Sequence, residues 1–300
     1  MKKIFFILLL WSGIVQASTT NYVWIPYPNG NLDIQCRAIW NAYDLKYGTN
    51  TVFFVKPGAD GIVAVQDMLN FSANRKFVCG SSSIVVSNAL IHPNDTNIDR
   101  IEPLLQTVVN AMVWYVPNNN RSQTFTELVA YLKNLNRPIN LGVYFSNQQG
   151  IAHYLGKTYD LKINLINYRT GSQMYPDLAS GALDLAFDSG GAIDVAQDTK
   201  KFRIAGYLAI GDYERLKDYQ NFKSGNTNFS MFFLWLGIII PKDMKPEAKN
   251  AITTELRTIV SQPTFKELAL RNISTVTAVG QPEILDTIHR QKKLFKEYWK

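Results

Sequence analysis

Cysteine and histidine, which supply most metal and redox centres, are scarce in this chain. Its 300 residues include two cysteines and three histidines, His92, His153 and His289. The histidines lie far apart in the sequence, and no H-E-x-x-H pattern is present. A zinc site needs several protein ligands brought close together, so we expect no bound metal.

The motifs of common enzyme classes are also missing. The sequence has no G-x-S-x-G elbow, no P-loop and no G-x-G-x-x-G after a predicted strand. The serine run "GSSS" (Gly80 to Ser83) follows a predicted strand, but no nearby base accompanies it to activate a nucleophile. We therefore expect a binding protein without a cofactor rather than an enzyme.

Apolar runs long enough to cross a membrane are absent. Residues 1–17, "MKKIFFILLLWSGIVQA", combine two lysines, an apolar run and a small-residue ending, the layout of a cleavable secretory signal. We predict cleavage after Ala17. A membrane anchor is the alternative, but the run is far shorter than the ~20 residues that span a bilayer. The apolar segment from Met231 to Ile240 ends at Pro241 and predicts a buried strand.

No dense run of one charge occurs. The formal net charge of +7 falls to +5 when Lys2 and Lys3 leave with the signal. Nucleic-acid binding requires a concentrated basic face, so we expect no nucleic-acid partner. A modest positive field favours small anions.

The two cysteines, Cys36 and Cys79, remain after cleavage and reach an oxidising compartment. A disulfide between them is one possibility. Both lie in segments that we predict to be packed elements, a helix and a strand, where free cysteine behaves as a small hydrophobe. We favour two buried, unpaired thiols.

The fold class follows from the alternation of β-rich runs with helical patterns. The run "NYVWIPY" predicts a strand, a helix is expected from Asp33, and a second set of such units occupies the middle of the chain. Turn-rich segments at 114–123 and 219–228 bracket that set. We predict an α/β protein of two domains, 18–118 with 229–300 and 119–228, each a mostly parallel sheet flanked by helices, joined by two chain crossings that form a hinge.

Three turns follow predicted strands: "PYPNGNLD", "KPGADG" and "CGSSS". In an open α/β sheet, ligands bind at the carboxyl ends of strands, beside helix N-termini. Free peptide N–H groups there suit a carboxylate. For the first turn, an ordinary connection with Asp33 as the helix N-cap is an alternative.

Seven stretches in order resemble the signatures of one family: "PYPNGNLDIQCRAIW", "VKPGADGIVAVQDM", "CGSSSIVVSNALI", "TELVAYLK", "YRTGSQMYPDLASGALDLAFD", "WLGIIIPKDMKPEA" and the closing "EYW". This is the Bug family of periplasmic receptors, which serve tripartite tricarboxylate transporters in Gram-negative bacteria. The resemblance covers nearly all of the chain after the predicted signal.

The resemblance implies a two-domain Venus flytrap in the periplasm that closes on a small organic carboxylate. It also implies integral membrane transporter subunits as partners, and we expect a monomer. The alternative is a receptor that reports its ligand to a membrane histidine kinase. The implied ligand-binding residues are Tyr27, Pro28, Asn29, Gly30, Asn31, Asp60, Ser81, Ser82, Ser83, Ser146, Asn147, Gln148, Gln149, Tyr168, Thr170, Ser172 and Asp188.

Three positions depart from the family pattern. Gly30-Asn31 replaces a glycine pair, "SNQQGIA" replaces a loop rich in hydroxyls, and "GADG" replaces G-A-G-G. If Asp60 lies in the site, its charge would repel a second ligand carboxylate and favour a monocarboxylate or a ligand with a cationic group. Alternatively, Asp60 points to solvent or caps the following helix.

Overall fold

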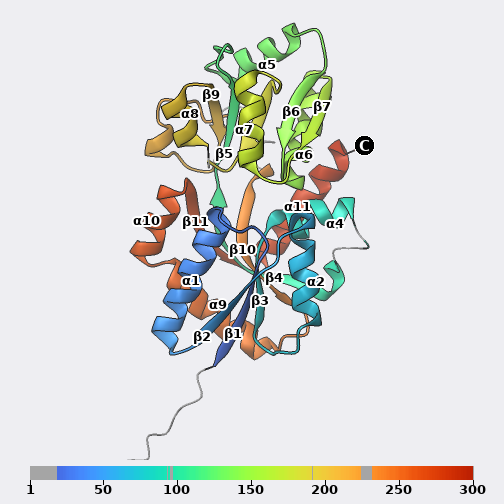
Figure 1. Cartoon of the computed structure of the whole chain (residues 1–300). Helices are drawn as coiled ribbons and strands as arrows, with labels where there is room; N and C mark the ends of the chain where they lie inside the picture. Colours follow the sequence, from blue (N-terminus) through green and yellow to red (C-terminus); the bar gives the residue numbers. More distant parts are fainter. Residues whose placement is uncertain (1–18, 93, 95–96, 191, 224–231, 300) are drawn as a thin grey trace, which may run out of the picture.

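The computed structural model describes residues 19–92, 94, 97–190, 192–223 and 232–299. Figure 1 shows two lobes, one above the other, each built around its own sheet. The predicted signal, residues 1–17, lies outside the described residues. No helix in the described part of the chain is long and apolar enough to cross a bilayer.

Lobe 1 contains a six-stranded sheet in the order β11-β4-β10-β3-β1-β2. The strands β1 to β3 are parallel, whereas β10 and β11 pair antiparallel with their neighbours. The strands are β1 (Thr20–Ile25), β2 (Asn50–Val55), β3 (Lys76–Ser81), β4 (Ile101–Asn110), β10 (Leu234–Pro241) and β11 (Ser274–Gly280).

Helices cover both faces of this sheet because its strands carry apolar side chains on both faces. In β3, Phe77 and Cys79 face α1, α9 and α10, while Val78 faces α2, α3 and α11. The helices are α1 (Asn31–Tyr47), α2 (Ile62–Asn70), α3 (Ser82–Val85), α4 (Ser87–Ile91), α9 (Pro246–Val260), α10 (Pro263–Arg271) and α11 (Glu283–Tyr298), with short 3₁₀ turns at Ala59–Gly61 and Ile98–Arg100.

Helix α1 shows how local sequence produces the element. Its buried residues Leu32, Cys36, Ile39, Trp40 and Tyr43 recur at helical spacing and form one face against the sheet. The helix ends at Gly48, whose left-handed backbone (φ 65°) donates its N–H to the Asp44 carbonyl.

The two cysteines form a disulfide, and the prediction of unpaired thiols is wrong. Cys36 lies on the buried stripe of α1, and Cys79 alternates onto the sheet face that this helix covers, with 6.0 Å between their Cα atoms. Burial alone cannot separate a pair from two free thiols, because both states keep the sulfurs away from water. The packing of α1 on β3 decides the pairing.

Lobe 2 contains a five-stranded sheet in the order β7-β6-β8-β5-β9, with β5 antiparallel to both neighbours. Helices α5 and α6 cover one face, and α7 and α8 cover the other. The elements are β5 (Met112–Pro117), α5 (Phe125–Asn134), β6 (Ile139–Val143), α6 (Ser146–Tyr159), β7 (Ile163–Asn167), α7 (Gly171–Ser180), β8 (Leu185–Asp188), α8 (Ile193–Thr199) and β9 (Phe202–Leu208), with a 3₁₀ turn at Glu214–Leu216.

The expected α/β fold of two lobes is confirmed, but both sheets are mixed rather than mostly parallel. The chain leaves the first sheet at Ala111, because β5 pairs with β8 and β9. The chain is back in the first sheet at Leu234, where β10 begins.

The C-terminal helix adds a contact between the lobes. Figure 1 shows α11 beside α4 and α6 at the junction. Phe295 of α11 packs so closely on Gly150 of α6 that an added Cβ would lie 2.1 Å from its ring, and Trp299 packs on His153. The end of the chain therefore contacts lobe 2 although its helix packs on lobe 1.

Candidate functional site

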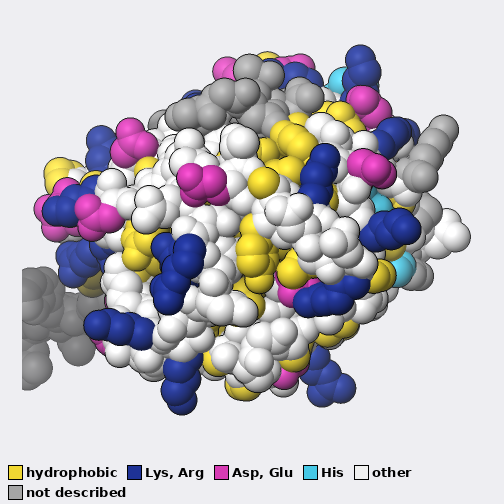
Figure 2. Space-filling model, turned by 90° about the horizontal axis from the view of Figure 1, so that it is seen from above, with side chains coloured by type: hydrophobic (Ala, Val, Ile, Leu, Met, Phe, Trp, Pro, Cys, Tyr) yellow, Lys and Arg dark blue, Asp and Glu magenta, His cyan; other side chains and the backbone are white. Residues whose placement is uncertain are grey.

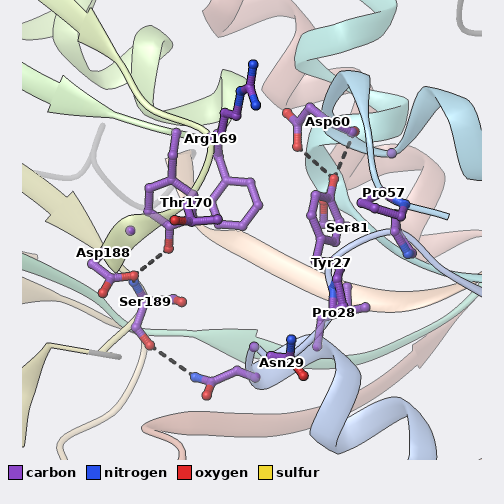
Figure 3. A pocket seen from close by; sticks show the side chains of 18 of the residues that line it. Tyr27, Pro28, Asn29, Pro57, Asp60, Ser81, Arg169, Thr170, Asp188 and Ser189 are labelled. Carbon is purple, nitrogen blue, oxygen red and sulfur yellow. Dashed lines mark hydrogen bonds between the residues drawn. The ribbon is translucent and has the colours of Figure 1, made fainter. Parts of the chain in front are cut away.

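A cavity of about 1030 Å³ lies between the lobes. Figure 3 shows Tyr27, Pro28, Asp60 and Ser81 on one side and Arg169, Asp188 and Ser189 on the other. Its wall also includes apolar side chains, such as Leu234 and Leu236 of β10. A mainly apolar cleft with a few convergent polar groups is the usual form of a small-molecule site.

The turn between β1 and α1 forms one edge of the cavity. Pro26 and Pro28 restrict the backbone, Asn29 is left-handed with φ 62°, and α1 begins at Asn31 with Gly30 in the N-cap position. Asp33 is therefore not the N-cap; its Oδ2 instead accepts the N–H of Asn29 at 2.9 Å. The first N–H groups of a helix lack intrahelical partners, so the start of α1 offers donors to the cavity.

Asp60 lies in the next loop and connects the lobes. Its Oδ1 accepts the Tyr27 hydroxyl at 2.7 Å, and its Oδ2 accepts the backbone N–H of Ser146 at 3.0 Å and the Ser146 Oγ at 2.6 Å. Burial raises the pKa of Asp60, and these hydrogen bonds oppose the rise. Helix α2 begins at Ile62 without a side-chain cap, so the alternative that Asp60 caps it is wrong.

Lobe 2 contributes a second carboxylate, Asp188, at the end of β8. This side chain is 3% exposed and accepts the hydroxyls of Tyr144 and Tyr175, the latter at 2.6 Å, as well as the N–H of Ser189. Burial, followed by the charge of Asp188, raises the pKa of both tyrosines. Both phenols therefore stay protonated and hold the carboxylate in place.

The turn before α7 contributes a positively charged side chain, Arg169, to the cavity wall. Among the described residues that line the cavity, Arg169 is the one lysine or arginine. Figure 3 shows its side chain extending away from Asp188. The neighbouring Thr170 and Ser172 hydroxyls lie 3.0 Å apart at the start of α7. Tyr168 donates its hydroxyl to Asp177 at 2.6 Å, and burial followed by this bond raises the pKa of Tyr168 to about 12.

Further contacts hold the lobes together. Asn31 donates its Nδ2 to the Ser189 carbonyl at 3.0 Å. The hydroxyls of Ser87 and Ser146 lie 2.6 Å apart, and the rings of Tyr27 and Phe145 meet edge to face. The two lobes are therefore in direct contact beside the cavity.

The residues expected at the site divide into two groups. Those that line the cavity are Tyr27, Pro28, Asn29, Gly30, Asn31, Asp60, Ser81, Tyr168, Thr170, Ser172 and Asp188. Those that are not part of its lining are Ser82, Ser83, Ser146, Asn147, Gln148 and Gln149.

The side chains of the second group make contacts outside the cavity. Ser146 bonds to Asp60, and Ser82, Ser83 and Asn147 are buried at the seam between the lobes. Gln148 accepts the N–H groups of Tyr144 and Phe145 and so caps α6, while Gln149 donates to Asn167. These side chains organise the start of α6.

Sequence reasoning missed several lining residues, among them Tyr144, Phe145, Arg169, Tyr175 and Ser189. Arg169 lies inside the turn that the resemblance indicated, and its positive charge was an available signal for anion binding. Tyr144 and Phe145 directly precede "SNQQG" at the end of a predicted strand. Tyr175 lies within a helix, where nothing in the local sequence marks it.

The described residues contain no group of three or more His, Cys, Asp or Glu side chains that could hold a metal ion. The polar groups of the described residues that line the cavity are instead helix N-termini, hydroxyls, the amides of Asn29, Asn31 and Asn110, one guanidinium and two carboxylates. Such a set can bind and orient a small polar ligand.

Comparisons with known proteins agree with this architecture. A family model described as "Tripartite tricarboxylate transporter family receptor" matches residues 36–298. A search of curated proteins finds no match. Among solved structures, R. palustris Rpa4515 with adipate has a TM-score of 0.79 at 14% identity, covering 93% of this chain and 96% of that one.

Two further structures are similar over most of their length. The periplasmic binding protein BugD has a TM-score of 0.73 at 16% identity, with 94% of this chain and 98% of that chain covered. MatC from Rhodopseudomonas palustris with bound malate has a TM-score of 0.75 at 13% identity, with 92% and 99% covered. At these identities the structures establish the fold, while the family model spans most of the sequence. The chain belongs to the receptor family of the tripartite tricarboxylate transporters.

Proposed function

We propose that this protein captures a small organic carboxylate in the cavity between its lobes and delivers it to the integral membrane subunits of a tripartite transporter. The observation that carries this proposal is the cavity itself, where the first turns of α1 and α7 meet Arg169. Two helix N-termini and a guanidinium form an anion-binding environment. The relatives solved with adipate and malate are consistent with this ligand class.

Delivery depends on closure of the lobes. Because residues of both lobes line the cavity, a bound ligand makes its full set of contacts only when the lobes are together. A ligand that binds the closed form more tightly shifts the population toward that form. The membrane subunits would then recognise the closed surface.

The remaining expectations follow from the same proposal. We expect a periplasmic monomer that does not turn its ligand over, and the Cys36–Cys79 disulfide is consistent with an oxidising compartment. Figure 2 shows lysine and arginine side chains spread over the face of lobe 2, with aspartate and glutamate between them. Among the described residues on that face, no concentrated basic patch supports nucleic-acid binding.

The test begins with freshly purified protein. Mass spectrometry of material released by denaturation identifies any ligand carried from the host. After refolding or dialysis, calorimetry with a panel of mono-, di- and tricarboxylates should give at least one saturable isotherm, and the same ligand should raise the melting temperature. A folded, ligand-free protein that binds no member of the panel would refute the proposal.

A further inference from the structure

The loop that carries Asp60 has an unusual backbone. Residues Gly58, Ala59, Asp60 and Gly61 all have positive φ, and Asp60 has φ 47° and ψ 43°. L-residues rarely adopt this region, although aspartate tolerates it better than most. Such backbone strain persists where surrounding contacts fix the conformation. For Asp60, Tyr27 and Asn88 of its own lobe donate to the backbone carbonyl, and Ser146 of the opposite lobe donates to the carboxylate.

The Asp60 carboxylate occupies an anion-binding position at the start of α6. Ser146 is the first residue of this 14-residue helix, and both its backbone N–H and its Oγ donate to Asp60 Oδ2. The positive end of the helix dipole and the free N–H groups favour an anion at this position. Tyr27 donates to the other oxygen. A side chain of lobe 1 therefore fills a set of donors that would suit a ligand carboxylate.

The interface between the lobes also contains buried polar side chains from α3, α4 and α6. Ser82 and Asn147 are each 3% exposed, and no hydrogen-bond partner for the Ser82 hydroxyl or for either Asn147 side-chain atom is found in the described structure. Ser87 contacts Ser146, and the Ser83 hydroxyl also faces the Asp60 carboxylate. Buried polar atoms without partners are uncommon in folded proteins. Removing the Asp60 side chain would leave the donors of Tyr27, Ser146 and Ser83 that now face its carboxylate without this partner.

We propose that Asp60 is a specificity-determining residue that occupies the anion position at the N-terminus of α6, so that the receptor selects ligands with a single carboxylate. This inference rests on the proposed function, because it concerns the ligand of the same cavity. One ligand carboxylate would bind near Arg169 and the first turns of α1 and α7. A second ligand carboxylate needs hydrogen-bond donors, but at the N-terminus of α6 the Asp60 carboxylate already accepts them.

The test compares pairs of ligands that share a chain length and differ by one carboxylate: hexanoate with adipate, and butyrate with succinate. Calorimetry gives the dissociation constants of the wild-type protein and of Asp60→Gly at one pH and ionic strength. Glycine accepts positive φ without strain, so the loop should keep its path. We expect the dicarboxylate of each pair to gain at least tenfold relative to its monocarboxylate in Asp60→Gly.

Two further variants complete the test: one separates the charge of Asp60 from the space that its side chain fills, and the other is a control. Asp60→Asn removes the charge but keeps a side chain of the same size between Tyr27 and Ser146, so the gain should be smaller than in Asp60→Gly. Asp160→Gly is the matched control, because Asp160 has φ 54° at the opposite end of α6 and is not part of the cavity lining. That variant also loses one aspartate at positive φ, and its ligand ranking should equal that of the wild type.

The outcomes distinguish this inference from the proposed function. Unchanged ranking in Asp60→Gly, with carboxylate binding intact, would overturn the role of Asp60 and leave the receptor function in place. If the dicarboxylate gains equally in Asp60→Asn and Asp60→Gly, only the charge of Asp60 matters. That result would overturn the claim that its side chain fills the anion position. A wild-type protein that binds no carboxylate would instead contradict the proposed function. Thermal melting of each variant confirms that it is folded.

Discussion

The Cys36–Cys79 disulfide leads to a quantitative prediction about stability. The two cysteines are 43 residues apart in the sequence, so the bond closes a long loop in the unfolded chain. The chain-entropy relation for a loop of this length gives about 4 kcal/mol of stabilisation at 25 °C. Reducing the bond should therefore lower the free energy of unfolding of lobe 1 by about that amount.

Urea unfolding followed by tryptophan fluorescence measures this loss. The buried tryptophans Trp24, Trp40 and Trp235 report on the lobe that contains both cysteines, and Trp114 reports on lobe 2. The wild-type protein is compared with and without dithiothreitol, since the two samples differ only in the bond. The Cys36→Ala/Cys79→Ala double variant is the control, because dithiothreitol should not change its midpoint.

Two results would refute the reasoning. Wild-type midpoints that agree with and without the reductant, after reduction is confirmed by mass, would show that the bond does not stabilise the fold. Labelling of two thiols in denatured protein that was never reduced would show that the bond is absent. Lobe 2 has no cysteine, so its transition should be the same in all samples.

Three further predictions test other parts of the structure. Arg169→Ala should weaken carboxylate binding by ~10-fold or more, since hydrogen bonds to charged groups contribute ~1.5–3 kcal/mol; unchanged affinity by calorimetry would remove Arg169 from the site. Because burial raises the folded-state pKa of Asp60 above 3.8, its contribution to stability is fully present below that unfolded value and is lost as pH rises through the folded pKa. Urea unfolding at a series of pH values should show that the free energy of unfolding of the wild type falls as pH rises, and that it falls less in Asp60→Asn. Identical dependence of this free energy on pH in the two proteins would contradict the prediction. Gly150→Ala should lower the melting temperature, because overpacking against Phe295 costs ~1–3 kcal/mol, against a helix-propensity gain of ~1 kcal/mol; a higher melting temperature would show that the ring moves aside.

The sequence by itself determined the elements whose signals are local. The apolar spacing of α1 fixes its buried face, and the nearby residues Thr124 and Glu127 form the capping box that starts α5. The ordered motifs also identified the family, because they record turns whose geometry depends on a few adjacent residues. Strand β4 (Ile101–Asn110) was missed because it is buried along nearly its whole length and lacks alternation, and because Glu102, Gln106 and Thr107 interrupt a continuous apolar run of the kind that marks β10. Strand β11 was missed as well, and its pairing with β4 is interrupted by a register shift.

The tertiary structure alone decided which distant groups meet. The disulfide joins residues 43 apart, and Asp60 bonds to Ser146, which lies 86 residues further along the chain. The sequence offers Ser146 to Gln149 as equivalent candidates, yet Ser146 bonds to Asp60 and Gln148 to its own helix start, while Tyr144, which sequence reasoning missed, bonds to Asp188. The Asp60–Ser146 contact depends on how one lobe approaches the other, whereas the disulfide and the Tyr144–Asp188 bond depend on packing within a single lobe. Local sequence does not encode such contacts, because they are set by the packing of whole helices and sheets.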